Sequence, residues 1–253
     1  MCAEKTVLKD GEHIEPLGNG ISVIVSNENR FSTDTILLAN FSEPKKHERC
    51  IEFGAGCGAI SFIWCRNTPP KRIISVELQK QAAEMMQRSV SMNELDERIT
   101  VMNEDLRTLK GKLPSGSADM IAMNPPYKIG GGGIVNPDQQ KRIARHETEC
   151  TIDDITAAAC DLLRFGGRLC LCQRPERLTD VLLSMRNAGI EPKRLRLVQQ
   201  RKNKAPKLFL VEGKRGARSG GLVTLPTLLI EDDSGNFSEE MIGIYGDYKS
   251  GHL

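Results

Sequence analysis

The apolar and polar positions of the chain change their period repeatedly. Short apolar runs, typical of buried strands, alternate with longer stretches in which apolar residues recur every three or four positions, as in amphipathic helices. Strands are expected at residues 21–27, 49–53, 72–78, 98–105, 118–124, 168–173, 193–199 and 207–212. Helices are expected at 31–41, 79–95, 137–163 and 175–187. A further helix is expected to begin directly after the glycines that follow residue 53.

Alternating strands and helices that close on two neighbouring strands predict a mostly parallel α/β sheet with one antiparallel member. Asn19 and Gly20 precede the first strand and predict a small N-terminal hairpin. We therefore expect a hairpin extension over 1–30, one main domain over 31–230 and an acidic C-terminal tail over 231–253.

Length and composition restrict the classes of protein. A chain of 253 residues with 39% hydrophobic content suits one large domain, and a monomer is the favoured state. No run of eighteen apolar residues occurs, and charges occupy the first eleven residues, which favours an intracellular, cytoplasmic protein without a membrane span. The eight cysteines include no C-x-x-C pair, so buried thiols are expected and no metal site.

Positive charge is concentrated in one part of the chain. The net charge is only +2, but Arg164 to Arg218 holds fifteen Lys and Arg against four Asp and Glu. Such a run is either a solvated face or a footprint for a phosphate backbone. Within it, "QQRKNKAPK" supplies Arg201, Lys202 and Lys204 as candidate nucleic-acid contacts.

A glycine turn gives the first chemical signal. In "IEFGAGCGAI" a strand ends near Glu52, and Gly54, Gly56 and Gly58 let the backbone approach a ligand before a helix begins. The spacing fits both the dinucleotide fingerprint and the S-adenosylmethionine pattern. Glu77 ends the next strand, where a carboxylate can accept hydrogen bonds from ribose hydroxyls in either case.

Two further strand ends carry polar residues. Asp105 follows the third strand, where it or its neighbouring backbone can bind an adenine edge, and Asn124-Pro125-Pro126-Tyr127 follows the fourth. Ligands of open α/β sheets collect at the carboxyl ends of the strands, so all of these signals converge on one crevice. A hydride-transfer enzyme has no evident use for Asn-Pro-Pro-Tyr there.

The set "EFGAGCG", "VEL", "NED" and "NPPY" resembles the class I S-adenosylmethionine-dependent methyltransferases, and the tetrad resembles their members that methylate a planar nitrogen. More narrowly, "NPPYKIGGGGIVNPDQQKRIARHE" is similar to the bacterial tRNA adenine-N6-methyltransferases that modify a valine tRNA beside its anticodon. Release-factor glutamine methyltransferases share the tetrad but carry a helical N-terminal domain. The loop here is extended to four glycines, Gly130 to Gly133, which departs from the family pattern.

The resemblance implies a Rossmann-like seven-stranded sheet with a reversed final hairpin, S-adenosyl-L-methionine as cofactor and tRNA as partner. It implies the following cofactor-binding residues: Phe31, Thr33, Glu52, Gly54, Gly56, Gly58, Glu77, Leu78, Asp105, Leu106 and Asn124. The implied catalytic residues are Asn124, Pro125, Pro126 and Tyr127. The implied substrate-binding residues are Tyr127, Gly131, Arg201, Lys202 and Lys204.

The tetrad suits adenine chemistry. The exocyclic amine of adenine is a poor nucleophile, because its lone pair is delocalised into the ring. The carbonyl of Pro125 and the side-chain oxygen of Asn124 can accept the two amine hydrogens, and Tyr127 can stack on the base. Glutamine in a protein, a ribosomal RNA base, DNA adenine and a non-catalytic RNA-binding role remain as alternatives. We interpret His146 as structural or as a substrate contact, and Cys57 and Trp64 as packing residues.

Overall fold

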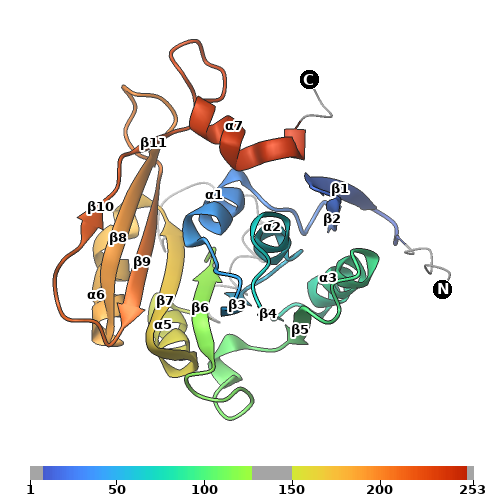
Figure 1. The fold of residues 1–253 in the computed structure, drawn as a ribbon, viewed down its shortest axis with the longest axis horizontal. Helices are drawn as coiled ribbons and strands as arrows, with labels where there is room; N and C mark the ends of the chain where they lie inside the picture. The colour runs from blue at the N-terminus through green and yellow to red at the C-terminus, as the bar shows by residue number, and fades with distance from the viewer. Residues whose placement is uncertain (1–7, 127–149, 250–253) are drawn as a thin grey trace, which may run out of the picture.

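The computed structural model describes residues 8–126 and 150–249, and they form two sheets with helices on both faces of the larger one (Figure 1). A small antiparallel hairpin, as predicted, is made by β1 (Glu12–Gly18) and β2 (Ile21–Ser26). The strands of the large sheet are β3 (Arg49–Phe53), β4 (Arg72–Glu77), β5 (Ile99–Asn103), β6 (Ala118–Met123), β7 (Leu163–Gln173), β8 (Ile190–Gln199), β9 (Leu208–Arg215), β10 (Val223–Thr224) and β11 (Leu228–Leu229). Over the described ranges, no helix is long and apolar enough to cross a membrane.

The large sheet has the strand order β10-β8-β9-β7-β6-β3-β4-β5, with β11 also paired to β8. β3 to β7 are parallel to one another, whereas β9 runs antiparallel between β7 and β8. The predicted mostly parallel sheet of seven strands with a reversed final hairpin is thus confirmed. Two further strands of two residues each extend its β8 edge.

Helices cover both faces of this sheet (Figure 1). The helices are α1 (Thr33–Ser42), α2 (Ala59–Asn67), α3 (Lys80–Met92), α5 (Ile152–Leu162), α6 (Leu178–Asn187) and α7 (Glu239–Tyr245), with single turns η1 (Leu106–Thr108), η2 (Pro175–Arg177) and η3 (Gly246–Lys249). One hydrophobic cluster joins α1, α2, α3, α7 and the hairpin to the sheet, and a second joins α5 and α6 to its other face. Side chains alternate between the clusters along each strand, as the pleat requires: Cys50 lies in the first and Ile51 in the second.

The helix predicted over 137–163 differs from the observed one. Residues 137–149 lie outside the described part of the chain, and α5 begins after Thr151, which forms a capping box with Asp154. The helix ends at Leu162, one residue before the predicted end, because Leu163 already has an extended backbone and pairs with β6 as the first residue of β7.

The C-terminal segment packs onto the first cluster. Met241 and Tyr245 of α7 are buried, and Arg66 of α2 donates to the backbone carbonyls of Ile244 and Tyr245. The ring of Tyr248 lies 5.8 Å from that of Phe31, just before α1. Residues 231–249 therefore contribute to the packing around α1, and the proposed domain boundaries stay a prediction.

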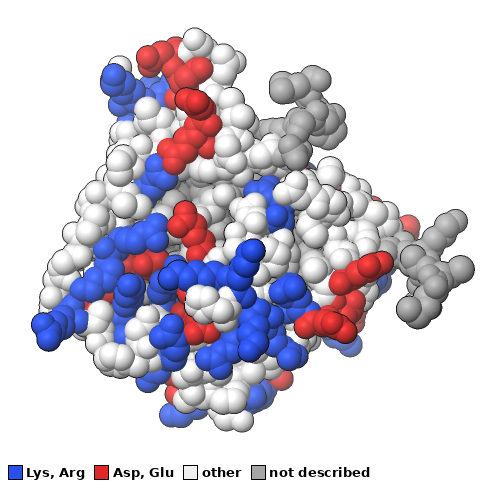
Figure 2. Space-filling view, viewed as in Figure 1, with Lys and Arg blue, Asp and Glu red and all other residues white. Residues whose placement is uncertain are grey.

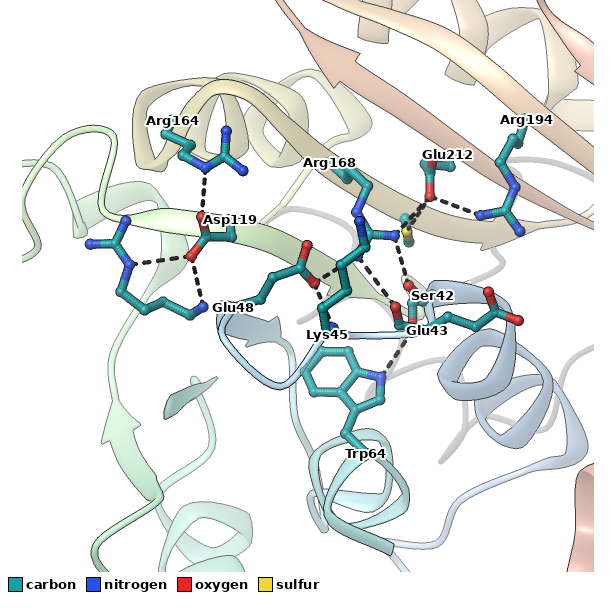
Figure 3. Close-up of polar contacts among 12 residues, drawn as sticks. Ser42, Glu43, Lys45, Glu48, Trp64, Asp119, Arg164, Arg168, Arg194 and Glu212 are labelled. Atoms are coloured by element: carbon teal, nitrogen blue, oxygen red, sulfur yellow. Dashed lines mark hydrogen bonds and ion pairs between the residues drawn. The ribbon is translucent and has the colours of Figure 1, made fainter. Parts of the chain in front are cut away.

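A buried ionic network ties the end of α1 to three strands (Figure 3). Arg168 of β7 contacts Glu48 at 2.8 Å and Glu212 of β9 at 3.1 Å, and it donates to the carbonyl of Ser42, the last residue of α1. Arg194 of β8 shares Glu212 at 3.2 Å. Both carboxylates are almost completely buried, so each depends on its guanidinium partner. Trp64, a core residue as interpreted, is fully buried, and its indole also reaches Ser42.

Candidate active site

The glycine turn opens the site at the carboxyl end of β3. Gly54, Gly56 and Gly58 have φ angles of 59°, 55° and 84°, which other residues rarely adopt. A Cβ atom on Gly58 would lie 2.5 Å from the Cε atom of Met86, so the turn also needs glycine for space. The backbone between β3 and α2 is therefore free of side chains at three alternate positions, and it can approach a ligand closely.

Three predicted strand ends meet beside this turn. Phe53 of β3 pairs with Met123 of β6 on one side and with Val76 of β4 on the other, and Glu77 pairs with Asn103 of β5. Because the strands are parallel and in this register, the residues that follow them emerge at one edge. The structure thus brings the glycine turn, Glu77 and Asn124 together, as the sequence predicted.

Glu77 is held by the backbone around it. Its carboxylate is buried and accepts hydrogen bonds from the amides of Gly56 and Gln79, each at 2.7 Å. One bond comes from the glycine turn, so Glu77 links the ends of β3 and β4. Each carboxylate oxygen has a further lone pair with which it can accept a bond from a hydroxyl.

Glu52, nominated as a cofactor contact, lies below the turn and is 1% exposed. Its carboxylate accepts from the amide of Ser61 at 3.0 Å and also from the Ser61 hydroxyl. Burial raises the pKa of Glu52 to about 7, against the effect of these bonds. In the described structure this carboxyl group orients the first turn of α2, which lies beneath the glycine turn.

The end of β5 supplies Asp105 and Leu106. The Asp105 carboxylate accepts from the backbone and guanidinium of Arg107, and this pairing lowers the pKa of Asp105 below its usual range. Its side chain is therefore engaged, and the neighbouring backbone is the better candidate for an adenine edge. Leu106 is buried, whereas Leu78, which follows Glu77, is 43% exposed.

Asn124 is positioned by two side chains that the sequence analysis did not assign to the site. Its amide nitrogen donates to the Thr35 hydroxyl at 3.0 Å, and its oxygen accepts from the Cys172 thiol at 3.1 Å. Gln173, also not assigned, donates weakly to the carbonyl of Pro126 at 3.5 Å. Cys172 and Gln173 end β7, the parallel neighbour of β6, and this position was the one signal in the sequence that pointed to them.

Other predicted residues lie around this edge or outside the described chain. Thr33 begins α1, and its hydroxyl lies 3.0 Å from that of Tyr245. Cys57 is buried, and burial raises its pKa to about 12, in agreement with a packing role. Tyr127, Gly131 and His146 lie outside the described residues.

The basic segment, Arg164 to Arg218, is divided between the two edges of the sheet. Lys193, Arg194, Lys214 and Arg215 lie at the edge where the parallel strands begin, because β9 ends where β8 starts. This edge is the lower edge of the sheet in Figures 1 and 2, and Figure 2 shows Lys and Arg gathered over it. Acidic side chains lie over α7 and the loop before it. Five cations of the segment lie at the carboxyl edge instead: Arg174, Arg201, Lys202, Lys204 and Lys207.

Several cations at the lower edge are already neutralised. Arg164 and Arg49 both pair with Asp119, at 2.5 and 3.3 Å, and Arg194 belongs to the network of Figure 3. At the carboxyl edge Arg201 pairs with Glu231, whereas Lys202 and Lys204 are exposed in the β8–β9 turn. Among the described residues, no group of three or more His, Cys, Asp or Glu is placed to hold a metal ion.

Known proteins resemble the chain in sequence and in fold. The family model described as methyltransferase small domain matches residues 24–184. The chain is 26% identical over 220 residues to a tRNA1(Val) (adenine(37)-N6)-methyltransferase of Porphyromonas gingivalis, covering 84% of this chain and 86% of that protein. It is 27% identical to the protein of the same name from Tolumonas auensis, covering 72% and 75%. The solved structure of a predicted O-methyltransferase from Agrobacterium tumefaciens has a similar fold, with a TM-score of 0.68, 20% identity, and coverage of 85% and 97%.

Proposed function

The chain belongs to the methyltransferase small domain family, and we propose that it transfers a methyl group from S-adenosyl-L-methionine to the N6 amine of an adenine in tRNA. The relatives from Porphyromonas gingivalis and Tolumonas auensis carry the name of this activity. The observation that carries the proposal is Asn124, whose side-chain amide is held at the end of β6 directly beside the glycine turn of β3.

The residues around the glycine turn fit the cofactor. Its backbone leaves room for a close approach, Glu77 can accept bonds from ribose hydroxyls, and exposed Leu78 can cover the adenine ring. Asp105 and Leu106 follow β5, and Phe31 and Thr33 lie at the start of α1; we propose these four residues as further cofactor contacts. When bound there, S-adenosyl-L-methionine supplies an electrophilic methyl group.

The chain's own part in the chemistry lies with Asn124 and Pro125. We assign the Asn124 oxygen, which accepts a bond from Cys172, as the acceptor of one amine hydrogen of the base. The carbonyl of Pro125 can accept the other hydrogen, so that the amine nitrogen regains a localised lone pair as charge develops. A separate general base is not required before transfer, since the proton becomes acidic once the nitrogen is cationic. Stacking by Tyr127 on the base completes the proposed site.

Charge supports an RNA acceptor. Lys202 and Lys204 are exposed at the same edge as Asn124, where a phosphate backbone would pass while a base enters the site. A glutamine side chain in a protein would meet the same tetrad but would not need these cations. We expect a monomer that acts in the cytoplasm.

The test is incubation of the purified chain with radiolabelled S-adenosyl-L-methionine and tRNA that lacks the modification, followed by nucleoside analysis. We expect label in N6-methyladenosine, and its loss in Asn124→Ala. Label in another nucleoside, or only in added release-factor protein, would overturn the assignment of the acceptor.

A further inference from the structure

A hollow lies at the carboxyl edge of the sheet, on the side of β8 and β9. Its volume is about 280 Å³, close to the lower end of ligand pockets, which suits one nucleotide. It is bordered by the start of α1, the residue after β7, the end of β8, the start of β9 and the segment before α7. The lining residues used below are Thr33, Asp34, Arg174, Gln200, Lys207 and Phe237.

This hollow adjoins the proposed catalytic residues along two separate elements. On α1, Thr33 and Asp34 line it, and Thr35 is the residue whose hydroxyl contacts Asn124. After β7, Arg174 lines it, and the preceding residue, Gln173, reaches the carbonyl of Pro126. The lining residues Asp34 and Arg174 are therefore direct chain neighbours of Thr35 and Gln173, the two residues that contact the Asn124-Pro125-Pro126 segment.

Its lining combines positive charge with an apolar wall. Arg174 and Lys207 contribute two cations, and a guanidinium nitrogen of Arg174 donates to the backbone carbonyl of Lys207 at 3.0 Å. Val198, Leu208, Ile230 and the ring of Phe237 form the apolar part. Asp34 and Gln200 add acceptors for the amino groups of a base. Cations beside an apolar wall with a few polar groups match the phosphate and the base of one nucleotide.

We propose that this hollow binds the nucleotide next to the adenine that is methylated. The inference rests on the proposed function, and it adds a subsite that reads the sequence context of the target. A flipped adenine at Asn124 leaves its neighbour close to the same edge. The phosphate between the two nucleotides would contact Lys207 and Arg174, and the neighbouring base would lie against the apolar wall.

The test uses the full-length chain and tRNA assembled with a synthetic anticodon loop. Lys207→Met keeps the aliphatic stem and removes the charge, Lys207→Arg restores it, and Lys71→Met removes an exposed lysine at the opposite edge as a control. We expect Lys207→Met to raise KM for tRNA by about threefold to tenfold, as for one accessible charge contact, with kcat unchanged. Lys207→Arg and Lys71→Met should behave like the wild type.

A second arm identifies the contact. A neutral methylphosphonate linkage on one side of the target adenosine should raise KM for the wild type and have little further effect in Lys207→Met. An abasic residue on that side should raise KM for the wild type severalfold. The subsite would be overturned if Lys207→Met and the neutral linkage raised KM additively, whichever side of the target adenosine carries the linkage. Equal KM values for Lys207→Met and Lys71→Met would also overturn it. In both cases the proposed function would stand as long as the wild type methylates tRNA. An effect of the linkage without any effect of the abasic residue would also overturn it, because only a phosphate would then be bound. A wild type that methylates no RNA would overturn both proposals.

Discussion

Asn124 and Thr35 are joined side chain to side chain at 3.0 Å, although they lie 89 positions apart in the chain. The amide nitrogen donates to the threonine hydroxyl, and the amide oxygen accepts from the Cys172 thiol. Thr35 lies in the first turn of α1, and the network of Figure 3 anchors the last residue of the same helix. The orientation of Asn124 therefore depends on how α1 is seated.

This relationship predicts a positioning role for Thr35. Thr35→Val keeps the side-chain volume but removes the acceptor, so we expect kcat to fall by about tenfold, whereas Asn124→Ala should lower it by about 10²–10³ through loss of a transition-state acceptor. Thr35→Ser should retain most of the activity. Single-turnover rates and calorimetric Kd values for S-adenosyl-L-methionine provide the measurement. An unchanged rate in Thr35→Val, or a parallel loss of cofactor affinity, would contradict the role.

Glu77 gives a prediction about the cofactor. Glu77→Ala should weaken S-adenosyl-L-methionine binding by about 1.5–3 kcal/mol, the range of hydrogen bonds to a charged group. Glu104→Ala is a suitable control, because Glu104 follows the neighbouring strand and pairs with Lys112. Calorimetry on both variants decides the matter. Equal affinity in Glu77→Ala and the control, or a preference of the wild type for NAD, would remove Glu77 from the cofactor site.

Glu52 gives a pH dependence with a definite sign. Its pKa is raised from 4.5 to about 7 in the folded state, so the folded state binds more protons than the unfolded state between these values. The free energy of unfolding should therefore fall as pH rises through this window, by an amount on the order of 3 kcal/mol from this group. Glu52→Gln should remove the penalty and be more stable than the wild type at pH 8, with a smaller difference at pH 5.

Urea unfolding of the cofactor-free protein at both pH values measures this difference. Glu12 provides a control of opposite sign, because its bond to Arg88 lowers the pKa of its carboxyl group. Glu12→Gln should lower the free energy of unfolding near neutral pH, and the loss should shrink as the medium becomes acidic. A Glu52→Gln difference that does not change with pH would mean that this carboxyl group is charged in the folded state at both values.

Local patterns predicted the parts of the site that lie close together in the chain. The glycine turn and Glu77 could be found because a strand, a tight turn and a strand end leave short-range signals. Thr35 and Cys172 were missed, because their contacts with Asn124 arise only when α1 and β7 pack beside β6, and the position of Cys172 at a strand end was the one signal for either residue. The number of charges in the basic segment follows from the sequence, but their distribution in space does not: β8 crosses the sheet between Lys193 and Lys204, so these two lysines lie at opposite edges.

That distribution sharpens the prediction for RNA binding. Neutralising phosphates releases counterions, so the affinity for tRNA should fall log-linearly with salt, whereas cofactor binding should hardly respond. Replacing Arg201, Lys202 and Lys204 with alanine should flatten the slope by about one unit for each phosphate that is no longer neutralised. Lys202 and Lys204 are exposed, so they should account for most of the change, and Arg201 for less, since Glu231 already pairs with it.

The matched control replaces Lys46, Lys71 and Arg72, which carry the same charges on exposed side chains near the opposite edge of the sheet. Filter-binding titrations of bulk tRNA at several salt concentrations compare both triple variants with the wild type. The carboxyl-edge variant should weaken binding to all tRNAs similarly, because phosphate contacts carry no sequence information, while the control keeps the wild-type slope. Equal slopes in all three proteins would mean that the β8–β9 turn is only a solvated surface, and a glutamine acceptor in a protein would then become the stronger alternative.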